Sequence, residues 1–163
     1  MLLEHEMKWF LETPNDVALT VARLFLGGVL WIHGAQLVLG WFGGQGFSET
    51  VRTFTGPGMA LPAPLALIAI LTLFLAPLGL IAGALTRPAA LGLAIFMAVA
   101  ATKHLGNGFF MNWFGGQRGE GFEFHLLAVG AALTLAIRGA GAFSFDRWLA
   151  IRTPVASVRP VLA

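Results

Sequence analysis

The sequence contains no cysteine, and this absence removes several classes of redox chemistry. Thiol nucleophiles, C-x-x-C redox pairs, cysteine-bound iron–sulfur clusters and covalently attached c-type haem all require cysteine. The sequence also lacks a G-x-G-x-x-G run opening a β-α-β unit, which excludes a Rossmann nucleotide site. Electron transfer by this chain would therefore need a bound cofactor or a redox-active substrate.

Charged residues are also scarce. They make up 11% of the 163 residues, whereas a soluble domain has about 25%. Hydrophobic residues make up 57%, and the mean hydropathy is +0.79. Because so few polar residues cannot cover a water-soluble globule, we predict an integral membrane protein with a single domain over residues 1–163. The basic residues are scattered along the chain, which argues against nucleic-acid binding.

The apolar segments predict how many helices cross the membrane. A helix needs about 20 mostly apolar residues to cross about 30 Å of hydrocarbon. The segments that meet or approach this length are residues 17–39, 65–85, 89–105 and 122–138. Residues 86–88, Thr-Arg-Pro, form a tight turn between the second and third segments, since proline suits a first helical turn. The predicted fold class is therefore all-α, a bundle of four transmembrane helices.

Small residues recur at every fourth position in three of these segments. Such spacing lets helix backbones approach closely in lipid. The residues concerned are Gly79 and Gly83 in the second segment, Ala90, Ala94, Ala98 and Thr102 in the third, and Ala128, Ala132 and Ala136 in the fourth. A compact bundle explains these stripes, and a homodimer could use the same surfaces.

Short surface helices are expected at the ends of the chain. Residues 2–12 mix apolar and charged side chains in a pattern that suits a helix lying on the bilayer. The next residues predict a capping-box start for the first span, with Thr13 as the N-cap and Pro14 at the first helical position. A secretory signal has a basic start and a small-residue cleavage site. Neither is present, so the first span should remain in the mature protein.

The distribution of lysine and arginine predicts the orientation of the chain. Seven of these residues lie on the side of the termini and the 86–88 turn, namely Lys8, Arg23, Arg87, Arg138, Arg147, Arg152 and Arg159. The opposite side has Arg52, Lys103 and Arg118. Cytoplasmic segments carry an excess of basic residues. We therefore expect both termini in the cytoplasm and the two longer loops outside.

Polar side chains gather at one depth near the predicted outer ends of the helices. They are His33, Lys103, His104, Asn107, Glu123 and His125. Ionisable groups at membrane depth are costly and are functional candidates by default. A hydrogen bond to a neighbouring helix could satisfy each one separately, but three spans contribute, so we predict a shared polar pocket. Arg23 lies near the other end, about 9 Å into its span, where either snorkelling or a buried role would explain it.

The pentapeptide Trp-Phe-Gly-Gly-Gln occurs twice, at residues 41–45 and 113–117. Both copies lie in predicted outer loops, where anchoring at the membrane interface explains the aromatic residues. It does not explain the repeated glycine pair and amide. We therefore expect both loops to fold over the outer mouth of the bundle and to form the ligand-binding surface there. The binding residues would be Trp41, Gln45, Asn107, Trp113 and Gln117. In the first loop, Ser48 is expected to cap a short amphipathic helix.

Several motifs occur in an order that resembles the DoxX family of four-helix bacterial membrane proteins. They are Arg23 and His33 in ARLFLGGVLWIHG, the W-F-G-G corner, the Thr-Arg turn, the KHLGNG run and the G-x-G-x-x-S-x-D ending. Together they extend over residues 18–148, nearly the whole chain. The resemblance implies a bacterial inner-membrane protein of an oxidoreductase class, because relatives include the membrane subunit of thiosulfate:quinone oxidoreductase.

The resemblance also implies a quinone as the cofactor. A quinone site needs an apolar slot and proton-exchanging partners for two carbonyl groups, and histidine exchanges protons near neutral pH. His33 and His104 are the expected carbonyl partners, with Glu123 or His125 as a relay to the surface. An alternative is a haem b held between His33 and His104, although each ligand would then need a supporting hydrogen bond. No metal-ion site is predicted.

Two positions depart from the pattern of the resembling proteins. Those proteins often have a lysine shortly after the His-Gly of the first span and an acidic residue in the second span. Here Leu37 and either Ala76 or Pro77 occupy these places. The departures favour a second hypothesis of nearly equal weight, a non-catalytic membrane subunit or scaffold. Such a protein would act in the lipid bilayer with another redox protein or with further copies of itself.

Overall fold

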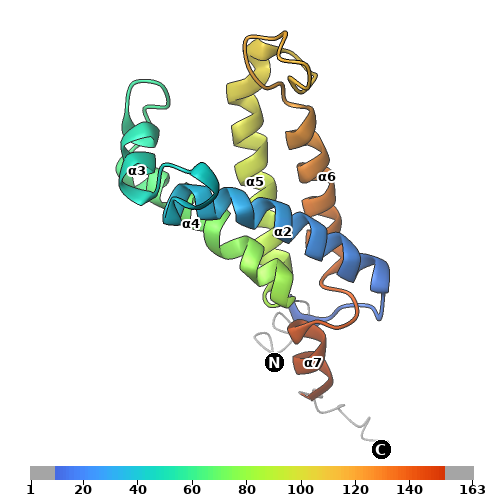
Figure 1. The fold of residues 1–163 in the computed structure, drawn as a ribbon. Helices are drawn as coiled ribbons and strands as arrows, with labels where there is room; N and C mark the ends of the chain where they lie inside the picture. Colours follow the sequence, from blue (N-terminus) through green and yellow to red (C-terminus); the bar gives the residue numbers. More distant parts are fainter. Residues whose placement is uncertain (1–9, 153–163) are drawn as a thin grey trace, which may run out of the picture.

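The computed structural model describes residues 10–152, and these residues form helices without any β-strand. The long helices are α2 (Val17–Leu39), α4 (Ala63–Ala82), α5 (Thr86–His104) and α6 (Glu123–Arg138), shown in Figure 1. The shorter elements are α3 (Phe47–Thr55), α7 (Phe145–Arg152) and the 3-10 turns η1 (Trp41–Gly43) and η2 (Leu105–Asn107). The predicted surface helix at residues 2–12 lies outside the described range except for residues 10–12.

Among residues 10–152, three helices are long and apolar enough to cross a membrane. They are α2, α4 and the segment Thr86–Asn107, which comprises α5 and η2. Helix α6 has 16 residues, and at 1.5 Å per residue it is about 24 Å long. That is shorter than the about 30 Å of a typical hydrocarbon core. The all-helical class is thus confirmed, with three candidate membrane-spanning helices, whereas the count of four membrane spans stays a prediction.

Two helix starts differ from the sequence prediction. Helix α2 is capped by Asp16, whose carboxylate accepts the N–H of Ala18 at 2.8 Å, so the prediction of Thr13 as N-cap is wrong. The Thr13 hydroxyl instead accepts the N–H of Gly141 at 2.6 Å, a partner 128 residues away along the chain. Helix α3 follows Gly46 and has no side-chain cap, so Ser48 does not have its expected role.

Helices α2 and α4 pack closely through glycines of α2. A Cβ atom on Gly34 would overlap the backbone of Leu73 in α4, and one on Gly27 would lie 3.0 Å from the carbonyl oxygen of Pro77. Pro77 is buried within α4. Because proline has no N–H, it cannot form the hydrogen bond to the carbonyl four residues earlier, which is that of Leu73. The close approach of α2 therefore occurs at the turn of α4 that proline alters.

Helices α5 and α6 pack through part of the predicted alanine stripes. Ala90 and Ala94 of α5 and Ala128 and Ala132 of α6 are buried. Ala98, the next member of the stripe in α5, is exposed. An α-helix has 3.6 residues per turn, so a strict four-residue repeat drifts away from the packed face. Small residues thus explain only part of the contact between α5 and α6. Further along α5, larger residues form the packed face.

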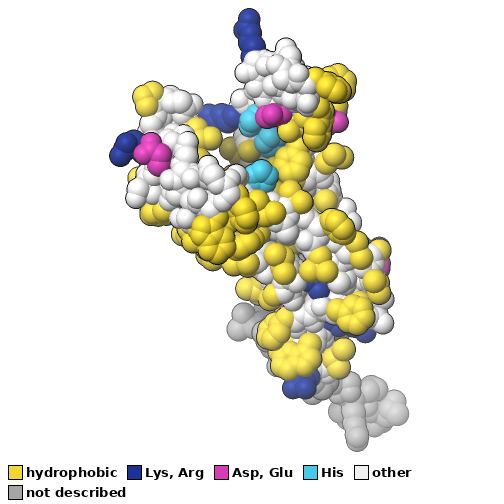
Figure 2. All heavy atoms as spheres, viewed as in Figure 1, with side chains coloured by type: hydrophobic (Ala, Val, Ile, Leu, Met, Phe, Trp, Pro, Cys, Tyr) yellow, Lys and Arg dark blue, Asp and Glu magenta, His cyan; other side chains and the backbone are white. Residues whose placement is uncertain are grey.

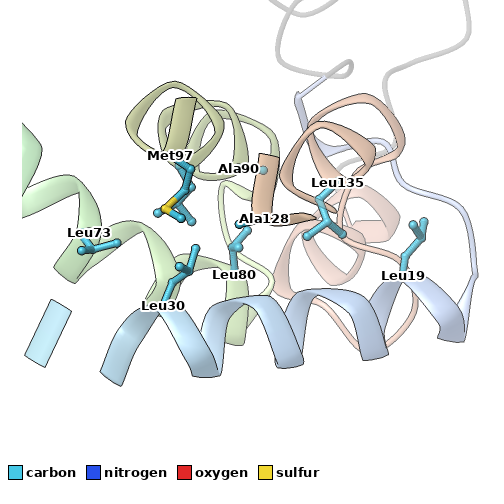
Figure 3. Close-up of a cluster of buried hydrophobic side chains, with 9 residues drawn as sticks. Leu19, Leu30, Leu73, Leu80, Ala90, Met97, Ala128 and Leu135 are labelled. Carbon is cyan, nitrogen blue, oxygen red and sulfur yellow. The ribbon is translucent and has the colours of Figure 1, made fainter. Parts of the chain in front are cut away.

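The main hydrophobic core joins the four long helices. Its buried members are Leu19, Leu30, Leu73, Leu80, Ala90, Leu93, Met97, Ala128 and Leu135. Figure 3 shows Leu19 and Leu30 pointing from α2 toward the helices that lie opposite. A smaller cluster of Phe54, Ala66 and Ile70 fixes α3 against α4. The core therefore holds α3 and the first loop in place beside the long helices.

The two ends of the long helices differ in chemistry. We call the end with Arg23 and the α4–α5 turn the arginine end, and the end with His33 and His104 the histidine end. Arg23 is only 2% exposed, so it is buried and does not snorkel to the surface. It donates hydrogen bonds to the backbone carbonyls of Leu80, Ile81, Ala140 and Phe143. Arg87 donates to the carbonyls of Glu12, Ala136 and Ile137.

Candidate functional site

A cavity of about 400 Å³ lies at the histidine end, between α2, α4, α5, α6 and the α5–α6 loop. It is lined by Leu30, His33, Gln36, Leu37, Leu73, Phe96, Met97, Ala100, His104, Met111, Glu120, Phe124 and His125. Figure 2 shows histidine side chains in the hollow between the α3 region and the tip formed by the α5–α6 loop. The wall is mainly apolar with a few polar groups, as is usual for small-molecule sites.

Helical periodicity explains why the wall residues lie together. Residues three or four apart occupy one face of a helix. Phe96, Ala100 and His104 follow this spacing on α5. His33 and Gln36 do the same on α2. Each of several helices therefore contributes residues from one of its faces to the cavity wall. The larger apolar side chains determine the width of the cavity.

His104 and His125 form a close pair of imidazole rings. Their centroids are 4.5 Å apart, and the ring planes are inclined by 34°. The Nδ1 atom of His104 lies 2.9 Å from the carbonyl oxygen of Glu120. A carbonyl oxygen only accepts, so Nδ1 must carry the hydrogen. The Nε2 atom of a neutral His104 is then an acceptor, and it becomes a donor only when the ring is protonated.

The other histidine of this pair is more deeply buried. His125 is 9% exposed, and its Nδ1 atom has no hydrogen-bond partner within residues 10–152. A buried polar atom without a partner costs about 1–3 kcal/mol. A water molecule or a polar group of a ligand in the cavity would remove this cost. Within the described residues, His125 thus keeps one ring nitrogen that no other group satisfies.

The structure brings three of the four predicted catalytic residues to the cavity wall. His33 is exposed and lies beside Phe124, with ring centroids 6.2 Å apart. Glu123 is absent from the wall. Its carboxylate instead accepts the N–H of Met111 at 3.2 Å and so fixes the α5–α6 loop. The carboxylate-bearing residue on the wall is Glu120, which sequence reasoning missed because it lies in an irregular loop.

The residues predicted to bind the cofactor lie outside the cavity wall. Trp41 packs edge-on against Trp31 with centroids 6.1 Å apart. The Gln45 side chain accepts a hydrogen bond from Thr53 at 3.3 Å. Asn107 donates to the Glu120 carbonyl at 2.9 Å, so it supports the same carbonyl that orients His104.

The second copy of the repeat is far more exposed. Trp113 is 77% exposed and Phe114 is 99% exposed. The Gln117 N–H donates to the side chain of Asn112 at 3.0 Å, within the same loop. Neither copy of the pentapeptide contributes a residue to the cavity wall. Gln36, which lines the cavity, joins the first copy to it by donating to the carbonyl of Phe42 at 3.2 Å.

The two positions that depart from the resembling proteins have different environments. Leu37 lies on the cavity wall and adds an apolar side chain there. Ala76 packs against the hydrophobic core, and Pro77 is fully buried. Within the described part of the chain, no three His, Cys, Asp or Glu side chains are grouped so that they could hold a metal ion. The polar character of the cavity comes mainly from imidazole groups.

These features define an all-helical membrane protein with a histidine-lined cavity at one end of its long helices. Comparison with known proteins narrows this class. The chain belongs to the DoxX family, whose family model matches residues 18–113. It is 33% identical over 135 residues to inner membrane protein YqjF of Escherichia coli (strain K12), and the match covers 83% of this chain and 94% of that relative. No solved structure matches the chain.

Proposed function

We propose that this DoxX-family protein binds the head group of a quinone in the histidine cavity and takes part in a membrane redox reaction. The three imidazole groups of His33, His104 and His125 carry the proposal, because they lie together on the wall of a mainly apolar cavity. A cavity of about 400 Å³ falls within the range of small-molecule sites. A planar ring with two oxygen atoms fits a site with apolar walls and few polar groups.

The histidines supply the proton chemistry that such a ligand needs. Reduction of a bound quinone to a hydroquinone would need two protons at its oxygen atoms, with the two electrons supplied by a separate redox protein. His104 has its Nδ1 hydrogen committed to the Glu120 carbonyl, so its Nε2 atom is the one that exchanges a proton with the ligand. His125 and His33 add two further imidazole groups to the same wall. Glu120, an exposed residue on the same wall, would pass protons from the surface to the histidines as the ligand takes them up.

The proposal includes four membrane spans, with α6 as the fourth. Several large apolar residues of α6 are exposed and would contact lipid, namely Leu126, Leu127, Leu133 and Ile137. Its 16 residues would suffice if the flanking loop residues sit at the interface. The positive-inside rule then puts both termini in the cytoplasm and the histidine cavity near the outer surface. Both aromatic–glycine loops would lie on that outer side.

A second candidate function is that of a non-catalytic subunit that binds another redox protein. The exposure of Trp113 and Phe114 favours this function, because large aromatic side chains are common in protein interfaces. Leu37 and Ala76 favour it too, since they leave the cavity and the core without the charges often found in the resembling proteins. Experiments can distinguish the quinone proposal both from this subunit function and from a haem bound by two histidines.

Analysis of the purified protein tests the proposal. The protein would be solubilised in detergent, its absorbance recorded and its organic extract examined by mass spectrometry. We expect a quinone mass and no Soret band. A Soret band would assign a haem instead, and the absence of both would favour the scaffold function.

Titration of the purified protein with a benzoquinone gives an independent measurement. His104→Ala should weaken binding at least tenfold, which corresponds to about 1.4 kcal/mol. Trp113→Leu is the matched control because it changes an exposed ring outside the cavity wall. Equal affinity of the wild type and His104→Ala would contradict the proposal. A loss in Trp113→Leu as well would mean that the second loop closes over the ligand.

A further inference from the structure

A second, nearly apolar groove of about 270 Å³ adjoins the histidine cavity. It lies between α3, the α3–α4 connection, α4 and α5. Its lining residues are Phe54, Met59, Leu61, Leu65, Ile68, Ala69, Thr72, Gly92, Ile95, Phe96, Val99, Ala100 and Lys103. Lys103 is the only charged residue among them. The groove is therefore suited to an apolar chain and offers little to a polar molecule.

The groove and the histidine cavity share part of their walls. Phe96 and Ala100 of α5 line both spaces. On α4, Leu73 faces the cavity, while its neighbour Thr72 faces the groove. The two spaces thus adjoin along α5 at Phe96 and Ala100. A ligand that extends from the histidine cavity into the groove would pass these two residues.

The dimensions and position of the groove suit the chain of a lipid-soluble ligand. The groove extends along α5 from Gly92 to Lys103, which is about 16 Å at 1.5 Å per residue. Large exposed apolar residues such as Ile68, Ile95 and Val99 form its edges, on helices long and apolar enough to cross a membrane. An apolar chain could therefore reach the groove from the bilayer without passing through water.

We infer that the groove binds the apolar chain of the ligand whose head group occupies the histidine cavity. The ligand class is then a quinone with an isoprenoid-type chain, and the inference rests on the proposed function. The shared wall at Phe96 and Ala100 supports one ligand for both spaces. A phospholipid chain with its phosphate at Lys103 is the competing occupant, and the experiment below distinguishes it.

Filling the groove tests the inference. Gly92 lies in α5, and a Cβ atom there would be 3.5 Å from a methyl group of Thr72, an ordinary contact. The Gly92→Leu side chain should therefore fold into the groove without disturbing the helix. Gly28→Leu is the control, because a Cβ atom on Gly28 of α2 would have no atom within 4 Å and this residue is absent from the walls of both spaces.

Two benzoquinones, one without a chain and one with a ten-carbon chain, would be titrated into each purified variant. We expect the chain to improve affinity for the wild type and for Gly28→Leu by at least tenfold. Gly92→Leu should lose this improvement and keep its affinity for the chainless quinone. Failure of the chainless quinone to bind any variant would overturn the proposed function itself.

Other outcomes would overturn only the inference about the groove. Equal affinities of the two quinones for the wild type would mean that the groove does not receive the chain. A chain effect that survives in Gly92→Leu, together with less co-purified phospholipid in that variant, would assign the groove to a phospholipid.

Discussion

Arg23 and Asp146 hold opposite sides of the α4–α5 turn. The guanidinium group of Arg23 donates to the carbonyls of Leu80 and Ile81 at the end of α4. The carboxylate of Asp146 accepts the N–H groups of Leu85 and Thr86 at the start of α5, at 2.8 and 2.9 Å. One side chain thus donates to carbonyls at a helix end, and the other accepts the free N–H groups of a helix start.

This arrangement explains why the sequence motifs at the arginine end occur together. The G-x-G-x-x-S-x-D segment supplies Asp146, and its Ser144 hydroxyl accepts the N–H of Arg147 at 3.2 Å. Gly141 has a φ of 79°, and a Cβ atom there would overlap the backbone of Asp16. The arginine of α2, the α4–α5 turn with the start of α5 at Thr86, and this segment therefore form one structural unit.

Asp146→Asn should destabilise the protein by about 1–3 kcal/mol, because an amide can accept only one of the two N–H groups and turns a donor toward the other. Asp16→Asn is the control. Asp16 accepts a single N–H, and asparagine is as good an N-cap as aspartate. Thermal unfolding of both variants in the same detergent would measure the difference. An equal effect of the two substitutions would refute the role assigned to Asp146.

Arg23→Ala should lower stability more strongly, by about 1–3 kcal/mol for each buried carbonyl group that loses its donor. The carbonyls of Ala140, Ile81 and Phe143 lose theirs, whereas that of Leu80 keeps the N–H of Gly83. Arg52→Ala is the matched control. Arg52 pairs with Glu49 at 3.3 Å on the surface of α3, with 79% of its side chain exposed, and such pairs contribute about 0–1 kcal/mol. The yield and melting temperature of the folded protein in detergent would compare them. If Arg23→Ala melted like the wild type, the hydrogen bonds of Arg23 would not stabilise the turn.

The positions of the long helices could be predicted from the sequence, because an apolar segment long enough to cross a membrane can form few structures other than a helix. Helix α2 begins and ends at the residues predicted for the first span. Helix α5 begins three residues before the predicted start, at Thr86. The cause is Asp146, which caps α5 from 60 residues away. The predicted turn at residues 86–88 is wrong, because these residues form the first turn of α5 and the chain turns at residues 83–85 instead. A prediction from local sequence could not include a partner as distant as Asp146.

The histidines of the candidate site could be predicted from the sequence, because they lie at a similar depth in the predicted membrane helices. The other residues of the cavity wall could not be predicted in this way. Depth places His33, His104 and His125 near one another without any knowledge of how the helices cross. Whether Phe96 or Leu73 faces the cavity depends on how each helix is rotated about its axis. The apolar sequence is too weakly periodic to define this rotation. Glu120 depends on the path of an irregular loop.

The orientation of the chain in the membrane can be tested with single introduced cysteines, because the natural sequence contains no cysteine. Ser48→Cys in α3 and Arg152→Cys at the end of α7 introduce single thiols at exposed positions. Given the excess of basic residues on the side of the termini, we expect a membrane-impermeant maleimide to label the first variant in intact cells. The second should be labelled only after the cells are opened. The reverse pattern would put the termini outside.

The repeated pentapeptide has different surroundings in its two copies. Gly43 and Gly115, at its third position, both have positive φ angles, of 77° and 68°. The next glycine differs between the copies. A Cβ atom on Gly44 would overlap the backbone of Gln36, whereas one on Gly116 would have no atom within 4 Å. The first copy is thus packed onto α2 beside the candidate site, and the second is open to its surroundings.

Gly44→Ala should therefore impair the protein, whereas Gly116→Ala should not. The methyl group at residue 44 must push the loop away from α2, which would break the hydrogen bond between the Gly46 N–H and the Gln36 carbonyl, 3.1 Å long. Gln36 lies on the cavity wall, so weaker quinone binding should accompany a lower melting temperature. The two variants carry the same substitution at equivalent positions of the repeat. If they behaved alike, packing of the first copy against α2 would not explain the glycine pair.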